Sequence, residues 1–351
     1  MLIRKNVPLA PMTTFKVGGP TRYFTEARTL EDVTQAVKHA RKQGWPLFVL
    51  GGGSNLVISD AGWPGLVLRI GITDIERRPG SEAFEVGAGE EWDKFVAYAV
   101  SQNCAGIECL SGIPGSTGGT PVQNVGAYGQ EVAETIESVQ VLDTRDEEIR
   151  EFCNEACGFS YRTSIFNSTE RGRYIVLRVD FALRAAGEPG IEYADLKRYF
   201  AAREKPPTLA ETREAVRQIR ARKGMLIVPG DEDCCSAGSF FKNPVLPDTE
   251  YKSLHERAQA RGLQIPSYPA LDAHRKVSAA WLVENSGFAK GYRRGPVGIS
   301  RKHALAIVNR GGAKAADIIA LKDEIQQQVG EMWDVQLQPE PVLIGFDNSP
   351  T

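Results

Sequence analysis

The sequence has no long apolar run and almost no excess charge of either sign. No stretch approaches the ~18 consecutive apolar residues of a membrane-spanning helix. With 42 Lys and Arg against 44 Asp and Glu, the formal net charge is -2, so bulk charge favours neither a nucleic acid nor a membrane as partner. Residues 1–15 lack the apolar core of a signal peptide. We therefore expect a cytoplasmic protein with no nucleic-acid or membrane partner.

Several common motifs are also missing. The six cysteines form no Cys-x-x-Cys pair, which argues against a disulfide framework or a structural zinc ion, and we expect no metal site. The chain has no Gly-Lys dipeptide and hence no P-loop, and no G-x-G-x-x-G fingerprint opens a helix at either of its glycine clusters. Ordinary nucleotide-binding folds are therefore not indicated.

Glycine is instead concentrated in two clusters. Residues 111–129, SGIPGSTGGTPVQNVGAYG, contain six glycines, two prolines and no charged side chain. Residues 51–55, GGGSN, separate two apolar segments that we expect to be strands, Leu47–Leu50 and Leu56–Ser59. Glycine lets main-chain amides approach a ligand closely, and successive amides in such turns bind anions. The clusters predict a phosphate-bearing cofactor lying along the backbone; tight turns on a β scaffold are the alternative.

The length of 351 residues predicts two or three domains, and the pattern along the chain favours three lobes. A helix starting at Thr29 and the strands around the triple glycine form an α/β lobe, and alternating segments such as Tyr174–Leu183 indicate a second lobe of mostly antiparallel strands. A third lobe follows, ending in a long helix at Ala315–Trp333. We place the lobes at residues 1–65, with a carboxy-terminal strand at 334–351 returning to the first lobe, then at 66–220 and 221–333.

The chain carries five motifs in a fixed order. They are LGGGSN from Leu50, GIPGSTGGTPVQNVGAYG from Gly112, YRTSIF from Tyr161, GSFFKNP from Gly238 and QPE from Gln338. In this order they resemble the motifs of the UDP-N-acetylenolpyruvoylglucosamine reductase (MurB) family, over nearly the whole chain. The resemblance implies an α+β fold, in which a PCMH-type FAD-binding unit of two lobes is joined to a separate α/β substrate-binding domain.

The resemblance also implies a reaction. NADPH reduces bound FAD, and the reduced flavin passes hydride to UDP-N-acetylglucosamine enolpyruvate, giving the peptidoglycan precursor UDP-N-acetylmuramate. Three residues would act on the substrate: Arg162 and Glu340 would stabilise the enolate that hydride addition leaves, and Ser239 would protonate it. FAD, NADPH and the enolpyruvyl UDP-sugar are thus the expected cofactors and partners, and we expect a monomer.

The remaining site predictions are contacts. The residues expected to bind FAD come from the glycine clusters: Gly51, Gly52, Gly53, Ser54, Asn55, Pro114, Gly115, Ser116, Gly118, Gly119, Asn124, Gly126, Ala127 and Tyr128. Those expected by resemblance to bind the substrate are Tyr193, Lys223, Asn243, Tyr268, Lys290 and His303. For each of them a structural role, as core aromatic, surface lysine or turn residue, remains the alternative.

Two features depart from the family pattern, and two other functions remain open. The segment from Gly224 to Ala237 is longer than expected, which puts the register of Lys223 in question, and the adjacent Cys234 and Cys235 predict sensitivity to oxidants. An oxidase on the same scaffold would oxidise NADPH rapidly with oxygen as sole acceptor. A sensor that binds the UDP-sugar without turnover would be colourless when purified.

Overall fold

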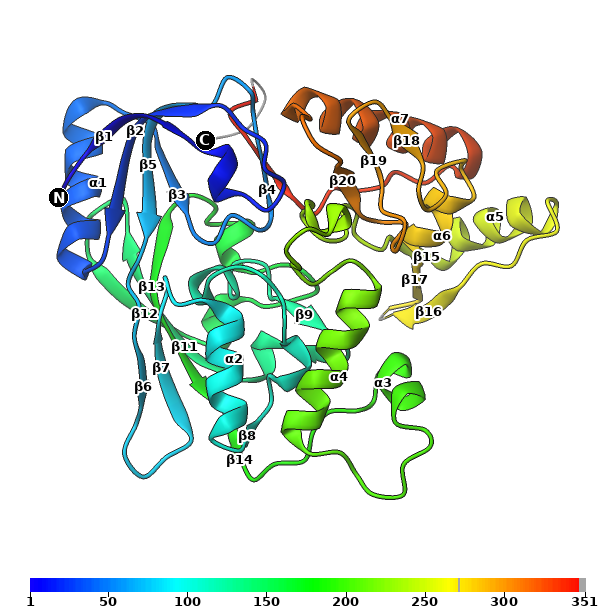
Figure 1. Ribbon diagram of the computed structural model, residues 1–351, viewed down its shortest axis with the longest axis horizontal. Coiled ribbons are helices and arrows are strands. Elements are labelled where there is room, and N and C mark those ends of the chain that lie inside the picture. Colours follow the sequence, from blue (N-terminus) through cyan, green and yellow to red (C-terminus); the bar gives the residue numbers. More distant parts are fainter. Residues whose placement is uncertain (271, 347–351) are drawn as a thin grey trace.

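The first lobe is a mixed sheet covered by one helix. A computed structural model, which describes residues 1–270 and 272–346, shows three lobes (Figure 1). The first lobe's sheet has the order β1-β2-β5-β3, with β2, β5 and β3 parallel and β1 antiparallel at the edge. Its elements are β1 (Arg4–Pro8), β2 (Pro20–Ala27), α1 (Leu30–Gln43), β3 (Leu47–Leu50), β4 (Leu56–Ile58) and β5 (Trp63–Ile70).

Residues at its two ends define the start and the end of helix α1. The Thr29 side chain accepts a hydrogen bond from the amide of Asp32, and Gly44 ends the helix in the left-handed conformation. The predicted boundary between the first two lobes, after residue 65, falls inside strand β5. This strand belongs to the first sheet, so the first lobe extends beyond that boundary.

The second lobe is a five-stranded antiparallel sheet of order β12-β11-β13-β7-β6. The ring of Phe95 on α2 packs 5.0 Å from that of Phe181 on β13, and one continuous apolar core joins this lobe to the first. Its elements are β6 (Ile75–Arg77), β7 (Ala83–Gly87), α2 (Trp92–Ser101), β8 (Cys104–Ala105), β9 (Gly126–Ala127), β10 (Gln130–Glu131), β11 (Ile136–Asp143), β12 (Ile149–Cys153), β13 (Tyr174–Ala182), β14 (Arg184–Ala185), α3 (Ala194–Tyr199) and α4 (Leu209–Arg222).

The third lobe combines two small antiparallel sheets, β15-β17-β16 and β18-β19-β20, with three helices. Its core also takes in Phe15, Val17 and Val57 of the first lobe, so the lobes share buried surface. Its elements are β15 (Val245–Pro247), α5 (Asp248–Gln259), β16 (Ser267–Ala270), β17 (His274–Val277), α6 (Ala279–Glu284), β18 (Arg293–Arg294), β19 (Val297–Ile299), β20 (Ile307–Asn309) and α7 (Ala315–Trp333).

The tail of the chain returns to the first lobe. Strand β21 (Val342–Ile344) pairs in parallel with β4, and the red end of the ribbon in Figure 1 lies against that blue strand. The last part of the predicted tail strand, residues 347–351, lies outside the described residues. Within the described part of the chain, no helix combines the length and apolarity needed to cross a membrane.

Candidate active site

A single large cleft of about 1170 Å³ is lined by all three lobes. It contains most residues predicted for a site. From the predicted FAD contacts, Gly51, Gly52, Gly53, Ser54, Asn55, Pro114, Gly115, Ser116, Gly118, Gly119, Gly126, Ala127 and Tyr128 line it. From the other predictions, Arg162, Ser239, Glu340, Tyr193, Lys223, Asn243, Tyr268 and His303 line it.

The two glycine clusters pack directly against each other. A Cβ added to Gly52 would lie 2.5 Å from the Cα of Gly115, so the two backbones leave no room for a side chain between them. Gly119 is different: it lines the cleft, its φ is not left-handed, and an added Cβ would meet nothing within 4 Å. Neither packing nor backbone strain requires glycine there, and its open backbone leaves room for a ligand to approach closely.

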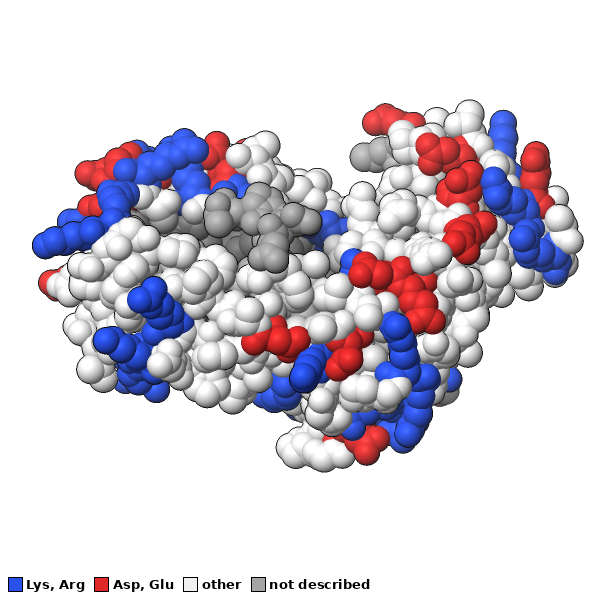
Figure 2. Space-filling view, turned by 90° about the horizontal axis from the view of Figure 1, so that it is seen from above, with Lys and Arg blue, Asp and Glu red and all other residues white. Residues whose placement is uncertain are grey.

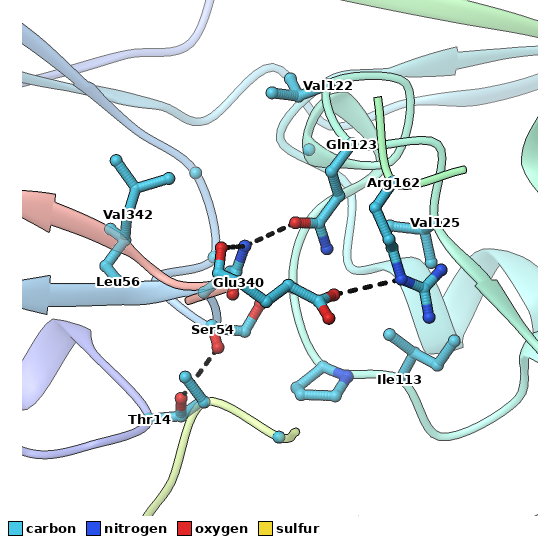
Figure 3. A pocket seen from close by; sticks show the side chains of 18 of the residues that line it. Thr14, Ser54, Leu56, Ile113, Val122, Gln123, Val125, Arg162, Glu340 and Val342 are labelled. Atoms are coloured by element: carbon cyan, nitrogen blue, oxygen red, sulfur yellow. Dashed lines mark hydrogen bonds and ion pairs between the residues drawn. The ribbon is translucent and has the colours of Figure 1, made fainter. Parts of the chain in front are cut away.

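The clusters also present unused hydrogen-bond donors. Among the described residues, the amides of Gly52, Gly53 and Ser54 on one side, and of Gly115 and Ser116 on the other, have no protein acceptor. An unpartnered backbone donor is costly where it is buried, as at Gly53 and Ser116, and grouped amides of this kind bind phosphate oxygens. Apolar side chains of Ile113, Val122 and Val125 line the same cavity (Figure 3). The cleft therefore fits the phosphate-bearing cofactor predicted from the sequence.

Asn124 is the exception among the predicted cofactor contacts. It is buried, does not line the cleft, and donates from Nδ2 to a carboxylate oxygen of Glu131 (2.8 Å) and to the carbonyl of Ser160 (3.1 Å). Its own side-chain oxygen accepts from the amide of Ala133 at 3.1 Å. The polar atoms of Asn124 are thus engaged in holding the loop. Its neighbour Gln123 lines the cleft instead and accepts a hydrogen bond from Asn55 (Figure 3).

Arg162 stands in a tight turn. Ser160 and Thr163 exchange two backbone hydrogen bonds of 3.0 Å, and Arg162 between them has a left-handed φ of 55°. Such a backbone is unfavourable for a long side chain and persists where the surroundings impose it, often at functional sites. From this turn the guanidinium reaches the carbonyl of Gly126 at 2.8 Å and a carboxylate oxygen of Glu340 at 3.2 Å.

Glu340 is held beside Arg162 by the returning tail. Its amide donates to the carbonyl of Phe240 (2.8 Å), and the amide of Lys242 donates to the carbonyl of Gln338 (2.9 Å), so the QPE and GSFFKNP motifs run side by side. The Glu340 side chain is 14% exposed and points at Arg162 (Figure 3). Burial raises the pKa of Glu340, although Arg162 and Lys242 oppose the shift.

Ser239 contacts a histidine. Its hydroxyl oxygen lies 3.1 Å from Nε2 of His303, which follows the turn after β19. Burial, with smaller contributions from the positive charges of Lys223 and Lys290, lowers the pKa of His303 to about 4. The imidazole is therefore neutral at physiological pH.

The predicted substrate contacts divide into those in the cleft and one outside it. Tyr193 and Tyr268, 44% and 63% exposed, lie at its rim, and Lys223 pairs with Asp195 while lying 5.6 Å from the ring centre of Tyr128. Asn243 uses its side-chain oxygen to accept from the amide of Ala279 at the start of α6. Lys290 does not line the cleft, but its positive charge contributes to the lowered pKa of His303.

The long segment after Lys223 is tied down. Asp233, fully buried, accepts from the amide of Arg301 (3.2 Å) and from its Nε (3.1 Å), and Asp231 pairs with Lys302. Its apolar residues Met225, Leu226 and Ile227 form part of the cleft wall. The extra residues are thus a fixed part of the cleft wall. The Cys234 thiol donates to the carbonyl of Leu226 at 2.8 Å and burial raises its pKa, while the predicted oxidant sensitivity stays a prediction.

Four cationic residues of the cleft were missed. Lys276 on β17 places its ammonium 4.3 Å from the ring centre of Tyr161. Arg220 is 9% exposed, donates to the carbonyl of Met225, and has an Nε without a partner among the described residues. Lys242 and Arg171 are the other two. Two sequence signals were available: Arg220 lies one helical turn before Lys223, and Lys242 lies within the GSFFKNP motif.

Two family models match the chain. One, described as an FAD binding domain, matches residues 21–152. The other, described as the C-terminal domain of UDP-N-acetylenolpyruvoylglucosamine reductase, matches residues 230–344. Together they cover parts of all three lobes.

Curated relatives and a solved structure agree with these models. The UDP-N-acetylenolpyruvoylglucosamine reductase of Thermobifida fusca (strain YX) is 44% identical over 349 residues, covering 97% of this chain and 98% of that protein. That of Salinispora arenicola (strain CNS-205) is 46% identical over 346 residues, covering 96% and 94%. The crystal structure of the reductase (MurB) from Thermus caldophilus has a TM-score of 0.66 at 28% identity, covering 98% of this chain and all of that one.

Proposed function

Because the chain belongs to the UDP-N-acetylenolpyruvoylglucosamine reductase family, we propose that Arg162, Ser239 and Glu340 are the residues that act on its substrate. The chain is an FAD-dependent reductase that uses NADPH to convert UDP-N-acetylglucosamine enolpyruvate into UDP-N-acetylmuramate, a precursor of peptidoglycan. The oxidase and sensor alternatives are thereby set aside. The observation that supports the residue roles is that three lobes deliver these side chains to one cleft.

The two glycine clusters would bind the cofactor. Their free amides would hold the diphosphate of FAD, and the apolar wall formed by Ile113, Val122 and Val125 would border its ring system. FAD, when bound, takes up hydride from NADPH and supplies it to the terminal carbon of the enolpyruvyl group. The protein's share is to position the substrate and to stabilise the charge that hydride addition creates.

Arg162 and Glu340 would stabilise that negative charge. Hydride addition to the terminal carbon leaves a carbanion whose charge is delocalised into the adjacent carboxylate as an enolate, and the fixed guanidinium of Arg162 stabilises this negative charge. The raised pKa of Glu340 favours its protonated form as negative charge builds up nearby, and a protonated carboxyl donates a hydrogen bond to an enolate oxygen. Both groups are largely shielded from water, with 21% and 14% of their side chains exposed.

Ser239 supplies the proton. The O–H bond of Ser239 breaks as a C–H bond forms at the enolate carbon, so the hydroxyl acts as a general acid toward a strongly basic carbanion. The UDP portion would lie between Tyr193 and Tyr268 at the rim, with Lys223 toward its diphosphate and Asn243 nearby. The ammonium of Lys290, outside the cleft, would contribute only at longer range.

The first test separates the two halves of the reaction. In Ser239→Ala, reduction of the bound flavin by NADPH should be nearly unchanged. Its reoxidation by the enolpyruvyl substrate should slow by about 10²–10⁴-fold, because the general acid is gone. Anaerobic stopped-flow absorbance of the flavin measures both rates. Ser101→Ala, at an exposed position on α2, is the matched control. If both half-reactions slow together, Ser239 is not the proton donor.

We further propose that the protein works as a monomer in the cytoplasm, with no nucleic-acid or membrane partner. On the face shown in Figure 2, Lys and Arg are interspersed with Asp and Glu over the described residues, which matches a net charge of only -2. A surface of this kind does not attract nucleic acid or anionic lipid through its bulk field.

A further inference from the structure

The contact between Ser239 and His303 is built by the fold. The two residues are 64 positions apart in the sequence, yet the hydroxyl oxygen and Nε2 lie 3.1 Å apart. Ser239 follows Gly238, whose left-handed backbone is held by a hydrogen bond from its amide to the Ser236 hydroxyl (3.2 Å). On the other side, the Ser300 hydroxyl accepts from the amides of Lys302 (3.0 Å) and His303 (3.3 Å). Both partners are therefore fixed in position.

The charges around the ring limit what it does. Lys223, which follows α4, and Lys290, which follows α6, are the charged groups that lower the pKa of His303, in addition to its burial. A neutral imidazole carries a single N–H and accepts at its other nitrogen. If Nε2 accepted the Ser239 proton, that proton would point away from the substrate. If Nε2 carries the N–H, the Ser239 oxygen accepts from it and keeps its own proton free for the cleft.

We propose that His303 is a positioning residue for Ser239, donating its Nε2–H to the serine oxygen and thereby directing the hydroxyl proton toward the substrate. This inference rests on the proposed role of Ser239 as proton donor. It reverses the serine–histidine relation of hydrolases, where the imidazole takes the serine proton. It also assigns His303 a different part from the substrate contact expected from the sequence.

The arrangement accounts for the charge left on the protein. When the O–H bond of Ser239 breaks, its proton forms the C–H bond of the product and the electron pair stays on the serine oxygen. The Nε2–H of His303 then donates a charge-assisted hydrogen bond to this alkoxide. A proton from water restores the hydroxyl before the next turnover. No further oxidant or reductant is needed for this step.

The test uses the FAD-loaded enzyme and two substitutions of His303. His303→Leu removes the donor, whereas His303→Gln can place an amide N–H near the position of Nε2. At saturating enolpyruvyl UDP-sugar, His303→Leu should reoxidise its flavin about 10²-fold more slowly than wild type, while NADPH reduces it at the normal rate. His303→Gln should recover most of the loss. His39→Gln on α1, away from the cleft, is the control for the same chemical change.

Several outcomes would overturn the proposal. A His303→Leu enzyme with a higher KM but an unchanged saturating rate would make His303 a substrate contact only. If both residues act on the same step, adding His303→Leu to Ser239→Ala should slow reoxidation almost no further. If the two slowing factors instead multiply in the double variant, the residues act independently. An inflection in the pH profile of reoxidation near ~6.5 that His303→Gln abolishes would contradict a neutral donor. If Ser239→Ala itself does not slow reoxidation, the proposed role of Ser239 as proton donor is wrong. That result differs from a failure of the proposed role of His303, in which Ser239→Ala is slow but His303→Leu is not.

Discussion

At the scale of single residues, Glu340 combines a proposed role in the reaction with a cost in stability. Its carboxyl is largely buried, and its pKa is raised in the folded chain. A carboxyl whose folded pKa exceeds its unfolded value makes folding less favourable once it must ionise. This cost is absent below the unfolded pKa of ~4.3, grows between the unfolded and folded values, and is complete above the folded pKa. Active sites commonly carry such costs.

Glu340→Gln should therefore be more heat-stable than wild type at pH 8, and the difference should shrink toward pH 4. The amide keeps the size of the side chain but never ionises. Melting temperatures measured across this pH range test the trend, with Glu76→Gln at an exposed position on β6 as control. Flavin reoxidation by the substrate should fall in the same variant. A melting temperature below that of wild type at pH 8 would contradict this account.

At the scale of elements, one carboxylate joins α2, α4 and the glycine-rich stretch. Asp93 of α2 accepts from the amide of Gly112 (2.6 Å), from Arg213 (2.6 and 3.0 Å) and from Arg217 (2.6 Å). Burial opposes ionisation of Asp93, but the bonds from Arg213 and Gly112 and the charge of Arg217 outweigh it and lower its pKa. Helix α4 is thereby clamped to the start of the stretch that lines the cleft.

Asp93→Asn should lower the free energy of unfolding by on the order of 3 kcal/mol at pH 7, because two partly buried guanidinium groups lose their counter-charge. Since the pKa of Asp93 is depressed, its stabilisation is present above its ordinary pKa and is lost as the pH falls through the folded value. Urea unfolding at pH 7 and at lower pH tests both statements. Asp146→Asn, which removes a carboxylate that is 46% exposed and pairs with Arg150, should cost much less. Equal losses in both variants would contradict the clamp.

At the scale of the whole molecule, the cleft makes the lobes depend on each other and on the cofactor. The first two lobes share one apolar core, and the third lobe's core includes side chains from the first. Five residues of the glycine clusters that line the cleft have amides without an acceptor among the described residues: Gly52, Gly53, Ser54, Gly115 and Ser116. Cofactor binding should therefore stabilise the chain as a unit.

Removing FAD should lower the melting temperature, and adding it back should restore it. A free concentration 100 times the dissociation constant contributes about 2.7 kcal/mol, which corresponds to a few degrees in a chain of this size. Differential scanning fluorimetry measures the shift. Riboflavin, which lacks the diphosphate, should give a much smaller shift at the same concentration. An equal shift with riboflavin would contradict the amide cradle.

Local signals made much of the fold predictable. The Thr29 cap and Gly44 end of α1, and the apolar period of α7 over Ala315–Trp333, act over a few residues, so the sequence carries them directly. Helix α5, which buries only Leu254 and Ala258, and the three- and four-residue strands of the β15-β17-β16 sheet were not predicted, because each gives little apolar periodicity. Boundaries were less secure still, as β5 shows.

The sequence by itself determined the family and the reaction, because five ordered motifs carry these in short runs of residues, and the roles of Arg162, Ser239 and Glu340 stay predictions. Only the tertiary structure decided how the residues relate. In the folded chain Arg162 pairs with Glu340, and His303 contacts Ser239. The side chain of Asn124 holds its loop by hydrogen bonds, and Lys290 does not line the cleft. Such relations join positions far apart in the chain, and their geometry depends on the path of the whole backbone, which no local pattern records.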